Sequence, residues 1–97
     1  MVITNLKIVL KEKVIESGYI VIDNGLISKI GVGAYSGNEE VIDANGKIAM
    51  PGFIDIHIHG SSNIDFMDAT ADDYKTIAES LYREGVTTFL ATTLTAD

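Results

Sequence analysis

The sequence contains no cysteine, and this absence excludes disulfide bonds and thiolate chemistry. A chain without disulfides fits a reducing compartment, so we expect a cytoplasmic protein. Basic residues are also scarce, because 7 Lys and Arg stand against 14 Asp and Glu and leave a net charge of −7. Nucleic acids and anionic membranes attract proteins with clustered basic residues. We therefore expect neither of them as a partner.

Long apolar runs are missing as well. No run approaches the ~18 residues that a helix needs to span a bilayer. The segment MVITNLKIVLKEK has no basic region before its apolar residues and no small-residue cleavage site, so it does not predict a signal peptide. The chain has 97 residues, of which 46% are hydrophobic and 22% are charged. This composition indicates a globular protein with a modest core.

The single proline, Pro51, marks a change of pattern. Before it, short apolar runs alternate with polar residues, which predicts an all-β segment over 1–50. Asn24-Gly25 and Asn45-Gly46 are hairpin signals, because Asn and Gly tolerate positive φ. Strands are expected at 2–10, 13–16, 18–23, 26–31 and 40–50, the last itself a small hairpin. The glycines of GVGAYSGN do not have the strand–turn–helix context of a dinucleotide site, so we expect no such site.

After Pro51 the pattern predicts a β-α-β unit. PGFIDIHIHG has the character of a strand, and a loop is expected over 60–69. A helix is expected over 70–84, because Thr70 is a suitable N-cap and Gly85 suits the position directly after the C-terminal end of the helix. Apolar side chains recur at helical spacing at Tyr74, Ile77, Ala78, Leu81 and Tyr82. VTTFLATTL would then be a second strand, parallel to the first.

Both histidines of the sequence lie in PGFIDIHIHG, two residues apart. Side chains alternate faces along a strand, so Asp55, His57 and His59 share one face. The opposite face carries apolar side chains that we expect a helix to cover, namely Ile54, Ile56 and Ile58. Two imidazoles at i and i+2 are roughly 6–7 Å apart at Cα, which lets their nitrogens converge on one metal ion at about 2.0–2.1 Å.

We predict that His57 and His59 are metal ligands, and that Asp55 orients an imidazole or contributes a carboxylate beside them. The plainer alternative is a hydrogen-bonded histidine pair near a strand end. The position favours the metal, because α/β folds carry their chemistry at the C-terminal ends of parallel strands. Two imidazoles leave the site incomplete, since zinc takes three or four protein ligands.

Other catalytic signatures are weak. Ser61 and Ser62 have no G-x-S-x-G pattern around them, which argues against a serine hydrolase. The aspartates between 65 and 73 miss the spacing of a calcium-binding loop and fit a solvated loop and a helix N-terminus. Tyr74 and Tyr82 are most simply packing residues.

PGFIDIHIHG resembles the first barrel strand of the amidohydrolase superfamily, whose members carry an H-x-H pair there. HGSSNIDFMDAT is similar to the loop after this strand in N-acetylglucosamine-6-phosphate deacetylases, which commonly reads HGG-x-G-x-D-x-MDA. EGVTTFLATTLTAD resembles their second barrel strand. H-x-H alone also occurs in dihydroorotases, hydantoinases and deaminases, whereas the 65–68 and 92–95 stretches favour the sugar deacetylases. Ser61, Ser62 and Asn63 stand where these relatives often carry glycines.

The resemblance implies an α/β fold with a β segment. Residues 1–50 would be part of a small β-sandwich, and residues 51–97 would be the first β-α-β of a metal-dependent (β/α)8 barrel. A barrel takes ~250 residues. The chain would therefore be an N-terminal fragment, with the other metal ligands, the catalytic Asp and the phosphate-binding groups on later strands.

The resemblance also implies an activity, the hydrolysis of N-acetylglucosamine 6-phosphate to glucosamine 6-phosphate and acetate. The cofactor would be a divalent metal, such as zinc or iron, and the loop with Gly60, Asn63 and Asp65 would lie on the substrate side. No catalytic residue is expected in this chain, which would be inactive alone. Two alternatives stay open, namely another amidohydrolase acting on cyclic amides or nucleobases and a non-catalytic assembly module. Open sheet edges predict self-association, with a homodimer as the expected state.

Overall fold

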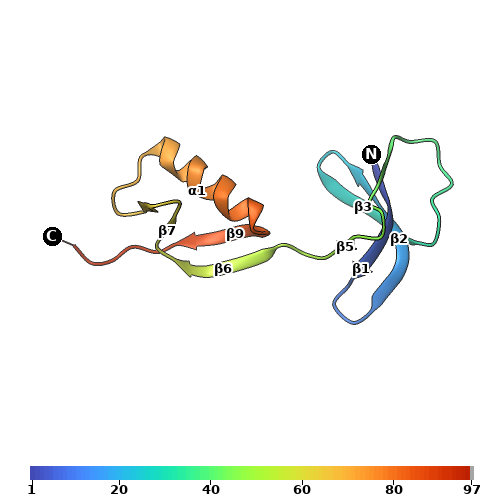
Figure 1. The fold of residues 1–97 in the computed structure, drawn as a ribbon, viewed down its shortest axis with the longest axis horizontal. Helices are drawn as coiled ribbons and strands as arrows, with labels where there is room; N and C mark the ends of the chain where they lie inside the picture. The colour runs from blue at the N-terminus through green and yellow to red at the C-terminus, as the bar shows by residue number, and fades with distance from the viewer. Residues whose placement is uncertain (97) are drawn as a thin grey trace. The chain divides into compact units, whose positions relative to one another are not determined.

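The computed structural model describes residues 1–96, so Asp97, the last residue of the expected barrel segment, lies outside the described residues. The chain divides into two compact units, and the boundary in the chain lies between Pro51 and Gly52. Within residues 1–96 the structure consists mostly of β-strands with one helix (Figure 1). Each unit is described by itself.

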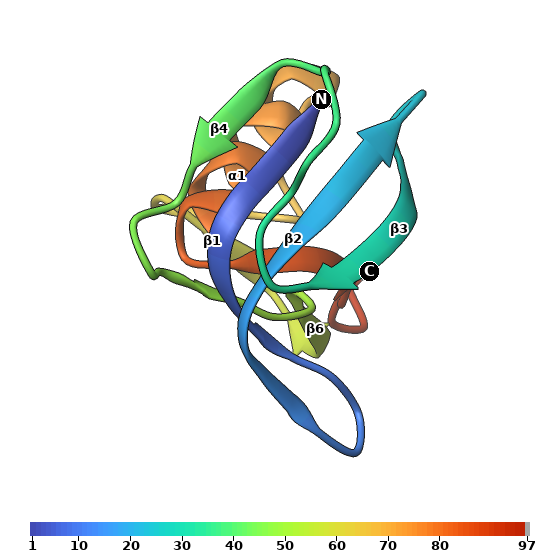
Figure 2. The same cartoon turned by 90° about the vertical axis from the view of Figure 1, so that its right-hand side faces the viewer.

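The first unit is a five-stranded sheet built around its first strand (Figure 2). Its strands are β1 (Val2–Val9), β2 (Val14–Asp23), β3 (Leu26–Val32), β4 (Val41–Asp43) and β5 (Ile48–Ala49). β1, β2 and β3 pair antiparallel in sequence order. The β2–β3 hairpin turns at Asn24 and Gly25, whose φ values are 49° and 76°. Positive φ at both central residues is what a type I′ turn requires, so this turn prediction is confirmed.

Two strand predictions in this unit are wrong. The expected strands 13–16 and 18–23 form one continuous strand, β2, because Gly18 stays in the ladder opposite Leu6 of β1 and Val32 of β3. The expected hairpin over 40–50 does not form, because β4 and β5 both pair parallel with β1 and not with each other. The Asn45-Gly46 turn is a tight loop between two segments that pair with the same edge of β1.

Hydrogen bonds to β1 explain this outcome. The N–H of Ala44 donates to the carbonyl of Thr4 at 3.0 Å before the turn, and the N–H of Lys7 donates to the carbonyl of Lys47 at 3.0 Å after it. Asn5 of β1 has a φ of 55°, and the β1–β2 register is irregular around this residue. The bulge in β1 thus lies opposite the turn, and the chain resumes its parallel course beyond it.

The core of the first unit is a small apolar cluster. It consists of Leu6, Ile8, Ile15 and Ile20, and Val2 is buried in the same unit. The edge strand β3 contributes little, since Leu26, Ile27 and Val32 are exposed. The cluster therefore depends on the β1–β2 pair, as expected for a unit with a small core.

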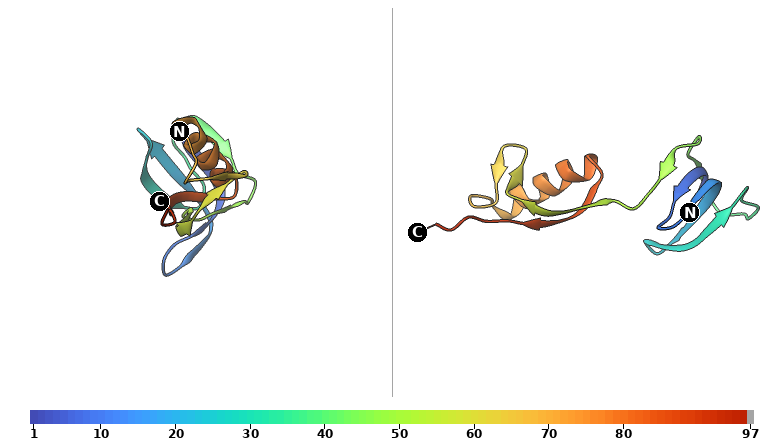
Figure 3. Two further views of the ribbon diagram at one scale, coloured as in Figure 1. Left: turned by 90° about the vertical axis from the view of Figure 1, so that its left-hand side faces the viewer. Right: turned by 90° about the horizontal axis from the view of Figure 1, so that it is seen from below.

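The second unit is a β-α-β arrangement with a small hairpin inserted (Figure 3). It contains β6 (Phe53–Ile58), β7 (Gly60–Ser61), β8 (Ile64–Asp65), α1 (Ala71–Arg83) and β9 (Val86–Ala91). β6 and β9 are parallel, which confirms that prediction. Residues 60–69 are not only a loop, because β7 and β8 pair antiparallel around Ser62 and Asn63, whose φ values are 54° and 62°.

Helix α1 begins and ends where the sequence predicts. The hydroxyl of Thr70 accepts the N–H of Asp73 at 3.4 Å, and one carboxylate oxygen of Asp73 accepts the N–H of Thr70 at 2.8 Å. This reciprocal pair is a capping box, which stabilises the first turn. Gly85 follows the helix with a φ of 87°, the left-handed conformation that favours glycine there.

The apolar face of α1 packs mainly on β9 and β7. The buried cluster consists of Phe66, Ile77 and Leu81, with Ile58 and Phe89 packed against it. Ile58 thus meets the expectation of helix cover.

Three of the expected packing positions are wrong. Ile54 and Ile56 are 67% and 73% exposed, so α1 does not cover them. Tyr82 is 70% exposed as well, whereas the Tyr74 ring lies against Phe66 with 5.3 Å between ring centroids. In residues 1–96, no helix is both long enough and apolar enough to cross a membrane.

Candidate metal centre

The structure brings the two histidines together at the end of β6. The Nε2 atoms of His57 and His59 lie 3.2 Å apart, and the rings meet edge to face with 5.0 Å between centroids. Two nitrogens bound to the same tetrahedral zinc ion at the usual bond length are separated by about 3.3 Å. The observed spacing therefore suits two imidazoles that share one ion through Nε2.

The other nitrogen of His59 meets the end of the second parallel strand. Its Nδ1 lies 3.1 Å from the main-chain carbonyl oxygen of Thr92, the residue directly after β9. The N–H of Thr92 in turn donates to the carbonyl of Ile58 at 2.8 Å. In the sequence, the Thr92–Thr95 stretch was informative only through its resemblance to relatives. This contact could not be predicted, because every residue type carries the same main-chain atoms.

Asp55 does not meet either imidazole. One of its carboxylate oxygens accepts the main-chain N–H of His57 at 3.1 Å, so the side chain turns along its own strand. In the described part of the chain, Asp55 makes no hydrogen bond to a ring nitrogen of His57 or His59. Its contribution to the site is to fix the backbone from which His57 projects.

The donor set is incomplete within residues 1–96. No group of three or more His, Cys, Asp or Glu side chains in this range is placed to hold a metal ion. Zinc in proteins takes three or four protein ligands, so two imidazoles supply half of a site. His59 is half-buried and His57 is exposed, which leaves the pair open on one side.

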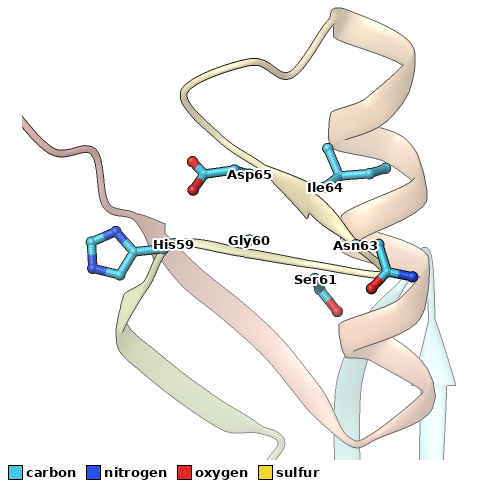
Figure 4. A pocket seen from close by; sticks show the side chains of 6 residues that line it. All are labelled: His59, Gly60, Ser61, Asn63, Ile64 and Asp65. Carbon is cyan, nitrogen blue, oxygen red and sulfur yellow. The ribbon is translucent and has the colours of Figure 1, made fainter. Parts of the chain in front are cut away.

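A hollow of about 350 Å³ lies beside His59 (Figure 4). It is lined by His59, Gly60, Ser61, Asn63, Ile64 and Asp65. Figure 4 shows His59 and Asp65 at one end of the hollow and Asn63 at the other, where the β7–β8 hairpin turns. Gly60, Asn63 and Asp65, the three loop residues expected on the substrate side, therefore lie around one space.

Local contacts fix the shape of this hollow. A Cβ atom on Gly60 would clash with the carbonyl oxygen of Ile64, so only glycine allows this approach. A carboxylate oxygen of Asp65 accepts the N–H of Met67 at 2.8 Å. The hydroxyls of Ser61 and Ser80 lie 3.1 Å apart, which ties the hairpin to α1 and gives Ser61 a structural role.

The chain is similar to several known proteins. The amidohydrolase family model matches residues 40–87. N-acetylglucosamine-6-phosphate deacetylase of Bacillus subtilis is 37% identical over 101 residues, which covers 100% of this chain and 25% of the relative. The enzyme of the same name from Vibrio furnissii is 44% identical over 76 residues, which covers 76% of this chain and 18% of the relative.

A solved structure shares the fold. It is a mutant of N-acetyl-D-glucosamine-6-phosphate deacetylase from Mycobacterium smegmatis in complex with N-acetyl-D-glucosamine-6-phosphate, and it matches with a TM-score of 0.82 at 28% identity. The match covers 99% of this chain and 25% of that one. The chain thus spans about a quarter of the length of the first of these relatives. Residues 40–87 of the chain thus match the amidohydrolase family, and the chain as a whole matches the N-terminal region of N-acetylglucosamine-6-phosphate deacetylases.

Proposed function

We propose that this chain is part of a metal-dependent hydrolase that removes the acetyl group of N-acetylglucosamine 6-phosphate. The products are glucosamine 6-phosphate and acetate. The observation that carries the proposal is the 3.2 Å approach of the two Nε2 atoms beside an open hollow. The names of the relatives supply the substrate. Two imidazoles alone would not distinguish this substrate from other amides.

In this proposal His57 and His59 hold one divalent ion, and zinc and iron both suit imidazole ligands. A bound divalent ion polarises the amide carbonyl and lowers the pKa of a bound water toward about 7. Asp55 holds the backbone of His57, and the loop with Gly60, Asn63 and Asp65 borders the substrate. The remaining ligands and the general base come from residues outside this sequence, so the chain alone does not turn over substrate.

The proposal extends to the architecture and the location. Residues 1–50 form part of a β-sandwich, and residues 51–97 form the start of a (β/α)8 barrel in a cytoplasmic enzyme. The match to the solved deacetylase supports this arrangement. In such barrels the active site lies at the C-terminal ends of the strands, which is where His59 stands relative to β6.

Metal binding by the full chain is the first test. We expect Co²⁺ or Zn²⁺ to bind with one ion per chain, and the double variant His57→Ala/His59→Ala to lose that binding. Glu79→Gln removes an exposed carboxylate of α1 far along the sequence from the pair and serves as the control. Equal binding by the wild type and the double variant would contradict the assigned ligands.

The substrate requires a second measurement. The polypeptide that carries this sequence in its native source should be purified, its mass determined, and acetate release from N-acetylglucosamine 6-phosphate measured. Hydrolysis of dihydroorotate or a hydantoin without acetate release would assign the chain to a cyclic-amide hydrolase. Metal binding without turnover of any of these amides would favour an assembly module.

A further inference from the structure

The two ring nitrogens of His59 have different partners, and this difference decides where its proton lies. Nδ1 is 3.1 Å from the carbonyl oxygen of Thr92, and Nε2 is 3.2 Å from Nε2 of His57. A main-chain carbonyl can only accept a hydrogen bond. A neutral His59 that makes this bond must therefore carry its proton on Nδ1 and leave Nε2 with a free lone pair.

The tautomer of His57 follows from that of His59. With Nε2 of His59 unprotonated, the 3.2 Å contact between the two Nε2 atoms is a hydrogen bond only if His57 is the donor. A neutral His57 then carries its proton on Nε2. The two histidines therefore adopt opposite tautomers when no ion lies between them.

The carbonyl of Thr92 is itself held in place. The N–H of Thr92 donates to the carbonyl of Ile58 at 2.8 Å, directly before His59 in the chain. The hydroxyl of Thr92 donates to the carbonyl of Leu90 at 3.2 Å. Thr92 is also half-buried. One residue at the end of β9 thus bonds to the main chain before His59 and to the ring of His59.

We propose that Thr92 is a positioning residue, whose main-chain carbonyl holds His59 as the Nδ1–H tautomer and directs the Nε2 lone pair toward the metal position. The tautomer follows from the hydrogen-bond geometry alone, whereas its effect on metal binding rests on the proposed function. Metal-binding histidines generally donate their second N–H to a carbonyl or carboxylate, and loss of such a partner costs about 10–100-fold in metal affinity.

The proposal also makes the two ligands unequal. His59 already carries an unprotonated Nε2 before any ion arrives, and its lone pair accepts the hydrogen bond of His57 until then. His57 must first exchange its proton, which leaves Nε2 while another is taken up at Nδ1 from water, so the ring stays neutral. His59 is therefore the ligand that is prepared in advance, and His57 is the ligand that rearranges.

Nitrogen NMR of the metal-free full chain tests the tautomers directly. At a pH of about 8, where histidine is neutral in general, the ¹⁵N shifts should show His59 protonated at Nδ1 and His57 protonated at Nε2. A His59 protonated at Nε2 would overturn the proposal, whether or not the chain binds metal. This measurement needs no variant, so it does not depend on the folding of a mutant.

A proline substitution tests the role of Thr92 in metal binding. Thr92→Pro removes the N–H that fixes the carbonyl, so His59 should shift toward the Nε2–H form and Zn²⁺ affinity should fall about 10–100-fold. Thr95→Pro places the same ring at an exposed position after the strand and is the control. Unchanged affinity in a folded Thr92→Pro variant would refute the positioning role. A wild type that shows the expected tautomers and binds no Zn²⁺ would support the hydrogen-bond geometry and refute the proposed metal function.

Discussion

Replacing Ile77 with alanine should unfold most of the second unit. Ile77 lies in the middle of α1, is 0% exposed, and packs with Phe66 and Leu81 in the cluster that joins the helix to β9. The substitution deletes three buried carbon atoms, each worth about 0.8 kcal/mol of transfer free energy, or roughly 2–2.5 kcal/mol in total. A residual cavity raises the expected loss of unfolding free energy to about 3–4 kcal/mol.

This loss is large for a unit of this size. A core of so few side chains rarely supplies more than about 3–5 kcal/mol of net stability. At about 4–8 °C for each kcal/mol in a small domain, the melting temperature should fall by at least about 12 °C. The same cluster holds β9 against the helix, so the contact between Thr92 and His59 should be lost as well.

Circular dichroism at 222 nm suits the measurement, because α1 is the single helix among residues 1–96. Tyr82→Ala is the matched control on the same helix, since Tyr82 is 70% exposed and should change the unfolding free energy by no more than about 0.5 kcal/mol. A loss below about 1 kcal/mol for Ile77→Ala would refute the assignment of this cluster as the core of the unit.

Three further outcomes follow from single contacts. The N–H and then the hydroxyl of Thr70 lower the pKa of Asp73, so the stability that this cap contributes is present above the usual Asp pKa and is lost as the pH falls through the lowered value. In an acid titration, the helix content of the wild type should therefore fall as the pH passes through the lowered pKa of Asp73. Asp73→Asn should already have the lower helix content at neutral pH. Gly60→Ala should open the β7–β8 hairpin, because its Cβ would meet the carbonyl oxygen of Ile64, and the amide signals of residues 60–65 should shift, whereas unchanged signals would contradict that clash. The full chain should form a dimer in analytical ultracentrifugation, Ile56→Lys should weaken it because this side chain is 73% exposed, and a monomeric wild type would contradict the expectation.

The elements that the sequence predicts correctly have their causes nearby in the chain. Thr70 and Asp73 form the helix cap within four residues, and Gly85 ends the helix with its own backbone. Asn24-Gly25 turns the β2–β3 hairpin for the same reason, since positive φ is a property of those two residues. The common face of His57 and His59 follows from strand alternation, which is also local.

The remaining features depend on pairing between distant segments. Asn45-Gly46 has the same turn chemistry as Asn24-Gly25, yet its flanking strands pair with β1, because an open edge of β1 was available to both. The exposure of Ile54 and Ile56 depends on where α1 crosses the unit, which their own alternation cannot specify.

Local sequence thus determined the helix, the Asn24-Gly25 turn and the histidine pair, because each depends only on neighbouring residues. Tertiary structure alone decided that β4 and β5 pair with β1 and not with each other, and it brought the carbonyl of Thr92 to Nδ1 of His59 across 33 residues of chain. Every residue carries the same main-chain carbonyl, so no residue type announces such a contact.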